Sequence, residues 1–183
     1  MRYAVISDIH SNLVAFEAIV NLLEKVDGLW CLGDVVGYGP APNECIESLL
    51  RFPHLWVAGN HDLGAVGKTS LDVFSHDARL ALEWTGGKLS RSNLKCLENL
   101  SVTLTPTKQV TLVHGSPRDP TWEYLFSSEA ADLNFGYFTS KIAFIGHTHV
   151  PTIFKKVPDS PCQIIPPFEK TFPLAEDARY IIN

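Results

Sequence analysis

Short apolar segments, each ending abruptly at a polar residue or glycine, constrain the fold of this chain more than any other feature. Runs of four or five residues rich in Val, Ile, Leu, Trp and Ala are typical of buried β-strands. They predict strands at residues 3–7, 29–32, 55–58, 110–113 and 142–145. Asp, Gly or His follows each of them at once, so a polar cluster comes after every predicted strand.

Helical periodicity fills most of the intervals between these strands. Ser11 or Asn12 is well placed to cap the first helix, and Gly86-Gly87 is expected to divide the longest periodic stretch into two helices. This β-α-β-α-β order predicts a largely parallel sheet covered by helices. The expected helices lie at residues 13–23, 43–51 and 128–138, with two more between 71 and 100.

After Pro151 the pattern changes to short strand-like pieces separated by proline-rich turns. These pieces predict antiparallel strands of a second sheet packed on the first, at residues 152–156, 162–165 and 179–182. The sequence contains no repeat, linker or low-complexity tract, so one domain is expected over residues 1–183.

The composition limits the classes of partner. The 183 residues are 45% hydrophobic and 19% charged, as in a globular protein, and 15 basic against 20 acidic residues give a net charge of −5. Proteins that bind extended DNA or RNA normally carry a basic face, so nucleic acid is disfavoured as the main partner. A small phosphate-containing substrate is compatible with this charge, because metal ions would supply the positive charge.

Membrane association is not expected either. No apolar run approaches the roughly 20 residues that span a bilayer, and the first residues do not resemble a signal peptide. The four cysteines form no C-x-x-C pair, so we expect reduced thiols and a cytoplasmic location. They are Cys31, Cys45, Cys96 and Cys162.

The polar clusters after the strands indicate a metal site. Side chains just beyond the carboxyl ends of strands in an open α/β sheet converge on one crevice. Imidazole and carboxylate together suit first-row divalent metals, and the lack of cysteine argues against a structural zinc site. The candidate donors are Asp8, His10, Asp34, Asn60, His61, Asp62, His114, His147 and His149.

Each motif alone has an ordinary explanation as a turn or a strand-end histidine. Their joint occurrence, in order and each after a strand, does not. The two other histidines, His54 and His76, are expected at the start of a surface strand and on a surface helix.

Together the clusters resemble the signature of the calcineurin-like metallophosphoesterase superfamily. The resemblance extends from residue 8 to residue 149, and segments 32–40 and 114–118 are similar to a bacterial and archaeal subgroup of small phosphodiesterase-like members. The signature residues are Asp8-x-His10, Gly33-Asp34, Gly59-Asn60-His61-Asp62, His114 and Gly146-His147-x-His149.

The resemblance implies an α/β fold (α+β in some schemes), a two-sheet β-sandwich flanked by helices in four layers, as a single metallophosphoesterase domain. It also implies two metal sites bridged by Asp34. His61 would protonate the leaving oxygen and Asp62 would orient it. One site would use Asp8, His10, Asp34 and His149, and the other Asp34, Asn60, His114 and His147.

This chemistry predicts a phosphohydrolase. Two divalent metals would share a hydroxide, aim it in line at phosphorus and neutralise the phosphate oxygens. The family resemblance implies manganese as the metal, with iron, zinc, nickel and cobalt as alternatives. We expect cleavage of a phosphodiester or a nucleotide-type phosphoanhydride. The alternatives are a phosphomonoesterase or nuclease of the superfamily, and a non-catalytic scaffold like the retromer subunit that resembles this fold, although a scaffold need not keep His61.

The sequence departs from the family pattern in one functional position. Serine/threonine phosphatases and symmetric dinucleotide hydrolases of the family carry Arg three to four residues after the Gly-Asp motif, where this chain has Gly37 and Tyr38. That argues against phosphoprotein substrates. Arg118 and Tyr124 are candidate substrate-binding residues instead, and a surface ion pair is the alternative for Arg118.

A second departure lies at the end of the sequence. Similar chains continue beyond a segment like Ile181-Ile182-Asn183 into Pro-Gly-Ser and further strands, whereas this one stops. We therefore expect a second sheet that lacks strands and has an exposed edge, which a homodimer would cover.

Overall fold

A computed structural model describes residues 1–23, 26–165 and 171–183. They form two compact units, Met1–Val102 and Thr103–Asn183, each of which is considered by itself. Each unit combines one β-sheet with helices, which confirms the predicted α/β class with two sheets and flanking helices. The prediction of a single domain stays a prediction. In the described ranges, no helix has the length and apolar character needed to cross a membrane.

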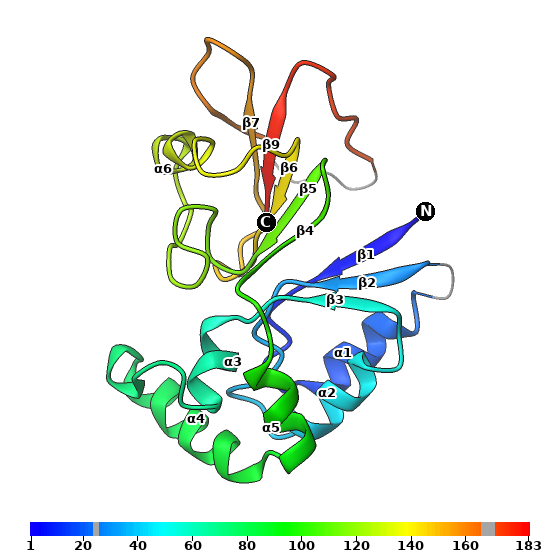
Figure 1. Ribbon diagram of the computed structural model, residues 1–183, viewed down its shortest axis with the longest axis vertical. Helices are drawn as coiled ribbons and strands as arrows, with labels where there is room; N and C mark the ends of the chain where they lie inside the picture. Colours follow the sequence, from blue (N-terminus) through cyan, green and yellow to red (C-terminus); the bar gives the residue numbers. More distant parts are fainter. Residues whose placement is uncertain (24–25, 166–170) are drawn as a thin grey trace. The chain divides into compact units, whose positions relative to one another are not determined.

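The first unit contains a three-stranded parallel sheet (Figure 1). Its strands are paired in the order β1-β2-β3, and the predicted bounds differ from the observed ones by two residues at most. Because all pairings are parallel, the carboxyl ends of the three strands lie at one edge of the sheet. The strands are β1 (Tyr3–Ile6), β2 (Gly28–Cys31) and β3 (His54–Trp56).

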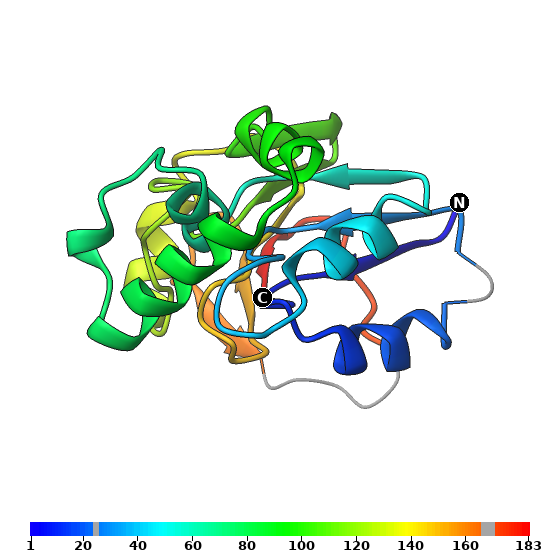
Figure 2. The same cartoon turned by 90° about the horizontal axis from the view of Figure 1, so that it is seen from below.

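Two helices cover one face of this sheet. α1 (Leu13–Val20) begins after Asn12, whose side chain accepts a hydrogen bond from the Ala15 N–H, as expected of an N-cap. α2 (Pro42–Leu49) starts at proline, which lacks the N–H that a first turn leaves unbonded. Figure 2, seen from below, shows α2 in front of the strands and α1 beside it. The core between these helices and the sheet includes Phe16, Ile46 and Leu49 from the helices and Leu29, Cys31 and Trp56 from the strands.

The remaining helices of this unit correct one prediction. α4 (His76–Lys88) runs through Gly86-Gly87 without a break, and the chain turns at Leu89 and Ser90 instead. Gly86 allows close packing rather than a turn, because a Cβ there would lie 2.9 Å from the Ala65 carbonyl oxygen. The other elements are α3 (Asn60–Ala65), the 3-10 turn η1 (Leu71–Val73) and α5 (Arg91–Glu98).

The second unit contains a six-stranded mixed sheet in the order β4-β5-β6-β9-β7-β8. β5 and β6, which we expected in the first sheet, are parallel neighbours here, so that sheet assignment was wrong. The predicted antiparallel pairing holds for β7 with β8 and β9, while β9 is parallel to β6. The strands are β4 (Thr103–Thr107), β5 (Val110–Val113), β6 (Ile142–Phe144), β7 (Ile153–Lys156), β8 (Gln163–Ile165) and β9 (Arg179–Ile182).

One helix, α6 (Ser128–Asn134), contributes to the core of this second unit. Ala131 and Phe135 are buried together with side chains of the sheet such as Phe154 and Ile181. All four cysteines of the chain are free, and the reduced state of their thiols stays a prediction. His54 and His76 are exposed at the starts of β3 and α4, as expected.

Candidate metal centre

The carboxyl ends of β1, β2 and β3 carry the candidate donors of the first unit. Two follow β1, one follows β2, and three form the first turn of α3, the next element after β3. The parallel strands bring three of them together: one ligand atom from each of His10, Asp34 and His61 lies within 4.8 Å of the others. The full set is Asp8, His10, Asp34, Asn60, His61 and Asp62.

Most predicted metal ligands have a backbone conformation that side chains rarely adopt. Five of the seven have φ angles between 49° and 69°. A left-handed conformation at a residue other than glycine costs on the order of 1–3 kcal/mol, and such residues cluster at functional sites. Among the non-glycine residues of the described ranges, eight have positive φ: Asp8, His10, Ser11, Asp34, Tyr38, His147, His149 and Asp159.

The Asp62 carboxylate fastens the loop after β2 to the first turn of α3. It is 0% exposed, and it accepts hydrogen bonds from four backbone amides. Its Oδ2 accepts from the Asp34 and Gly59 N–H groups at 2.9 and 3.1 Å. Its Oδ1 accepts from Val35 and Val36 at 3.0 and 3.2 Å. These contacts hold the backbone of the loop, and orientation of the His61 ring by Asp62 stays a prediction.

The Asp34 side chain is itself held in place. Its Oδ1 accepts a hydrogen bond from the His61 N–H at 2.8 Å, and its Oδ2 lies 3.8 Å from His10 Nε2. Gly59 permits this approach, because a Cβ there would lie 2.1 Å from Asp34 Oδ1. The loop after β2 and the first turn of α3 are thus fixed against each other at the carboxylate predicted to bridge the metals.

One nitrogen of the His10 ring is hydrogen-bonded to the backbone. Nδ1 lies 3.3 Å from the Val36 carbonyl oxygen, and since a carbonyl only accepts, we assign the hydrogen to Nδ1. Nε2 then presents its lone pair toward Asp34 Oδ2. Two acceptors that face each other are stabilised by a cation, and metal-binding histidines usually donate their other N–H to such an oxygen. His10 and Asp34 therefore fit a divalent metal.

His114 and His147 form a corresponding pair in the second unit. They follow β5 and β6, which are parallel neighbours, and both rings are buried. His147 Nε2 lies 3.2 Å from the Trp122 carbonyl oxygen, so Nδ1 is left facing His114 Nε2 at 3.1 Å. Two nitrogens that each lie about 2.1 Å from one cation are roughly 3–3.5 Å apart. This pair also fits a divalent metal.

The three other predicted ligands also follow strand ends. Asp8 is half-buried after β1, Asn60 is buried as the first residue of α3, and His149 is exposed two residues after His147. The predicted division into two metal sites combines residues of both units, and it stays a prediction.

Arg118 is engaged within the second unit. Its guanidinium donates hydrogen bonds to the Glu123 carboxylate, through Nε at 3.3 Å and through a shorter contact from Nη2. Partial burial would raise the pKa of Glu123, but hydrogen bonds from Arg118, Ser116 and Asn134 outweigh it, so this pKa is lowered. The geometry matches the surface ion pair that was the alternative for Arg118.

Tyr124 lies next to a predicted metal ligand. Its ring stacks on the His147 ring with centroids 3.8 Å apart and planes 22° apart. The Phe126 ring is nearly parallel to Tyr124, at 5.7 Å. Tyr124 therefore packs against the predicted site, and its contact with substrate stays a prediction.

Sequence reasoning did not identify Tyr38 as a site residue. Its ring centroid lies 5.0 Å from that of His10 and 4.6 Å from that of His61. The signal available in the sequence was the glycine on either side, Gly37 and Gly39, which indicates an unusual backbone at this point.

Two weakly acidic groups near the predicted site, the Tyr38 phenol and the Cys31 thiol, have raised pKa values. Burial is the main cause that raises the pKa of Tyr38, and the Asp34 carboxylate adds to it. Burial likewise raises the pKa of Cys31 well above its usual value, with smaller contributions from nearby carboxylates. Both groups are neutral at neutral pH, so neither adds charge to the site.

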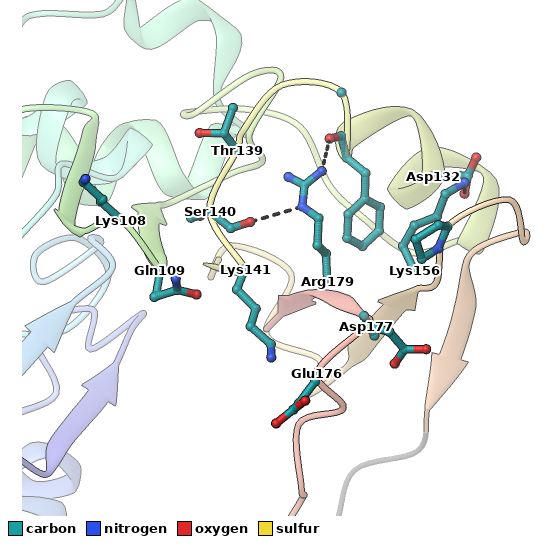
Figure 3. A pocket seen from close by; sticks show the side chains of 14 residues that line it. Lys108, Gln109, Asp132, Thr139, Ser140, Lys141, Lys156, Glu176, Asp177 and Arg179 are labelled. Carbon is teal, nitrogen blue, oxygen red and sulfur yellow. Dashed lines mark hydrogen bonds and ion pairs between the residues drawn. The ribbon is translucent and has the colours of Figure 1, made fainter.

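A separate hollow of about 630 Å³ lies at the other end of the second sheet (Figure 3). It is lined from the starts of β6 and β9, whereas His114 and His147 follow the ends of β5 and β6. Arg179 donates to the Ser140 and Phe135 carbonyl oxygens at 3.1 and 2.9 Å. Lys156 is paired with Asp132 at 2.5 Å. These two cations are already engaged by the protein.

Comparison with known proteins gives consistent matches. Residues 1–166 match the model of the calcineurin-like phosphoesterase superfamily domain. An uncharacterized protein of Methanocaldococcus jannaschii is 38% identical over 187 residues, which are 98% of this chain and 73% of that protein.

Two crystal structures are similar as well. A metallophosphoesterase from Sphaerobacter thermophilus is 42% identical with a TM-score of 0.85, over 100% of this chain and 75% of that one. A hypothetical protein from Pyrococcus horikoshii OT3 is 20% identical with a TM-score of 0.68, over 82% and 71% of the two chains. The second likeness shows the fold alone.

Proposed function

The chain belongs to the calcineurin-like phosphoesterase superfamily, and we propose that it is a binuclear metal-dependent phosphohydrolase acting on a phosphodiester or a nucleotide-type phosphoanhydride. Membership implies a phosphoester hydrolase that uses divalent metals. The observation that carries the finer proposal is that five predicted ligands keep left-handed backbone conformations. Strain of this kind persists where a function requires it.

The metals would be held by seven side chains of the two units. Asp34 would bridge the ions, because a shared carboxylate holds two like charges close together. When bound, a pair of divalent metals supplies Lewis-acid activation of water and neutralises charge on the phosphoryl oxygens. We propose Asp8, His10, Asp34 and His149 for one ion, and Asp34, Asn60, His114 and His147 for the other.

His61 would act as the general acid. Its side chain is buried beside His10, with ring centroids 4.7 Å apart, and its backbone N–H is tied to Asp34 Oδ1. A Cβ at Gly37 would lie 2.4 Å from His61 Nδ1, so the backbone there covers that nitrogen. We therefore assign proton transfer to Nε2, which would protonate the leaving oxygen. Asp62 supports this by holding the loop that carries Asp34.

Manganese is the proposed metal, with iron, zinc, nickel and cobalt as alternatives. Imidazole, carboxylate and amide ligands are compatible with each of these ions, so the supply of each metal decides which ion is bound. The four free cysteines favour a reducing compartment, and we propose the cytoplasm. A small phosphate compound is the proposed partner, and a homodimer is a further proposal.

Hydrolysis of two model substrates tests this function. Chelator-stripped protein would be assayed with and without Mn²⁺ on bis-p-nitrophenyl phosphate and on the monoester p-nitrophenyl phosphate. We expect metal-dependent turnover that favours the diester and is abolished by Asp34→Asn. Preference for the monoester would support a phosphomonoesterase, and cleavage of a DNA or RNA strand a nuclease. A folded protein that binds no transition metal and turns over neither substrate would support the scaffold.

A further inference from the structure

We infer that Tyr38 is a substrate-binding residue whose hydroxyl donates a hydrogen bond to a phosphoryl oxygen beside His61. The inference rests on the proposed phosphohydrolase function and adds the residue that recognises the phosphoryl group. It is carried by the backbone conformation of Tyr38, by the two rings it contacts and by the exposure of its side chain.

The backbone at Tyr38 is held in a strained conformation. Its φ is 56°, and Gly37 before it has a φ of 93°. The Gly39 N–H donates to the His10 carbonyl oxygen at 2.9 Å, and a Cβ at Gly39 would lie 2.4 Å from that same oxygen. The loop is held on one side of Tyr38 by the Gly39 hydrogen bond and on the other by the amides that bind Asp62. These contacts impose the left-handed conformation on Tyr38.

An aromatic residue is a costly choice at such a position. Glycine adopts positive φ freely and asparagine tolerates it, whereas a bulky side chain there is a true outlier. Glycine or asparagine at position 38 would therefore be compatible with the same loop at less cost. Residues that lower stability in this way are typical of sites where the side chain serves function. The tyrosine side chain thus needs an explanation other than folding.

The surroundings of the Tyr38 side chain indicate a role in binding a ligand. The ring lies edge-on to His10 and tilted over His61, the predicted ligand and the predicted general acid. Yet the residue is 53% exposed, so packing does not account for its size. Within the described part of the chain, its hydroxyl makes no hydrogen bond. The phenol is therefore a donor group beside the acid, with room for a ligand.

The chemistry of a phenol defines the ligand class. A phosphodiester or an internal phosphoanhydride group carries one negative charge per phosphoryl group, whereas a monoester carries nearly two at neutral pH. Residues 33–41 contain no Lys or Arg, so this loop offers a neutral donor and no cation. A neutral donor suits the singly charged group, in agreement with a diester or anhydride substrate.

Three variants test this role. Tyr38→Phe keeps the ring and the strain but removes the hydroxyl. Tyr38→Asn removes the ring and relieves the strain. Asp159→Asn, at an exposed turn residue with φ of 57° in the second unit, is the matched control. The readouts are kinetics on bis-p-nitrophenyl phosphate, binding of inorganic phosphate to the Mn²⁺-loaded protein by calorimetry, metal content, and thermal midpoint.

We expect Tyr38→Phe to lower kcat/KM about 10- to 100-fold, the effect of one hydrogen bond to a charged oxygen. Phosphate binding should weaken in parallel, while metal content and thermal midpoint stay as in the wild type. Tyr38→Asn should lose the same activity and unfold at a higher temperature. The control should change neither kinetics nor phosphate binding.

The outcomes separate this inference from the proposed function. Unchanged kinetics and phosphate binding in Tyr38→Phe would overturn the inference, as would a lower thermal midpoint in Tyr38→Asn, which would make Tyr38 structural. If the wild type binds phosphate but does not turn over, weaker binding in Tyr38→Phe would support the residue's role while the hydrolase proposal fails. If the wild type binds no phosphate with any metal, both are wrong.

Discussion

The Asp62 carboxylate accepts a hydrogen bond from the backbone N–H of Asp34 at 2.9 Å, across 28 positions of sequence. The buried acid therefore holds the residue predicted to bridge two metals, and it does so through the backbone rather than the side chain. Asp34 has a φ of 53°, and the three other amides on Asp62 belong to its neighbours Val35 and Val36 and to Gly59. The conformation of the predicted bridge thus depends on this carboxylate, in addition to the hydrogen bonds that Asp34 accepts from the His10 and His61 N–H groups.

Replacing Asp62 by Asn is expected to destabilise the protein and to reduce its metal content. The amide keeps the shape of the carboxylate but places an NH2 group against backbone N–H donors. Each buried amide left without an acceptor costs about 1–3 kcal/mol. Urea unfolding and metal analysis after gel filtration measure the two effects. Asp177→Asn, at an exposed turn before β9, is the control and should change neither. Full metal content in Asp62→Asn would contradict the positioning role.

Two glycine-to-alanine substitutions should act in opposite directions. A Cβ at Gly59 would lie 2.1 Å from Asp34 Oδ1 and 2.5 Å from the Asp34 nitrogen, so Gly59→Ala must displace the predicted bridge. Gly87 lies inside α4, and a Cβ there would meet no atom within 4 Å, so alanine should stabilise the helix by about 0.5–1 kcal/mol. Thermal unfolding of the two variants measures both effects. Equal thermal midpoints would show that the site tolerates movement of Asp34.

The local elements were predictable, because their signals are local. Strands such as β2 and β5 are short apolar runs bounded by Gly, Asp or His, and Asn12 is an ordinary N-cap. β4 was missed because Thr103–Thr107 contains a proline and alternates between exposed and half-buried residues. Gly86-Gly87 was misread because the sequence does not reveal that Gly86 lies against another helix.

Features that depend on contacts between distant parts of the chain could not be predicted from the sequence. Which sheet β5 and β6 join depends on pairing with β9, a strand that is far away in the chain. The candidate ligands were recognisable as a set, because each follows a strand. The backbone strain at Asp34 and Tyr38 could not be recognised in the sequence. A left-handed conformation at residues other than glycine depends on contacts with distant parts of the chain. Tyr38 became a candidate through this strain together with its ring contacts with His10 and His61.

His61→Ala should separate catalysis from metal binding. If His61 is the proton donor, the variant keeps its metal and loses turnover by about 10²–10⁴-fold, the usual effect of general acid catalysis. The loss should be smaller for a substrate whose leaving group needs no proton, such as p-nitrophenolate, than for an alkyl ester. Metal analysis and kinetics on both substrate types measure this. Loss of metal would instead assign His61 to the ligand set that its distance from His10 and Asp34 permits.

Stability at alkaline pH should depend on the buried thiol of Cys45. Burial, followed by Glu44 and Glu17, raises the pKa of Cys45 from 9.0 to about 12. The folded state therefore keeps this proton while the unfolded state releases it, so the contribution to stability is full below pH 9.0 and is lost as pH rises toward about 12. Urea midpoints of the wild type and Cys45→Ala, each measured near pH 8 and near pH 10.5, isolate the effect from that of the other thiols. The midpoint of the wild type should fall more between the two pH values. An equal fall in both proteins would mean that the thiol ionises in the folded state as readily as in the unfolded one.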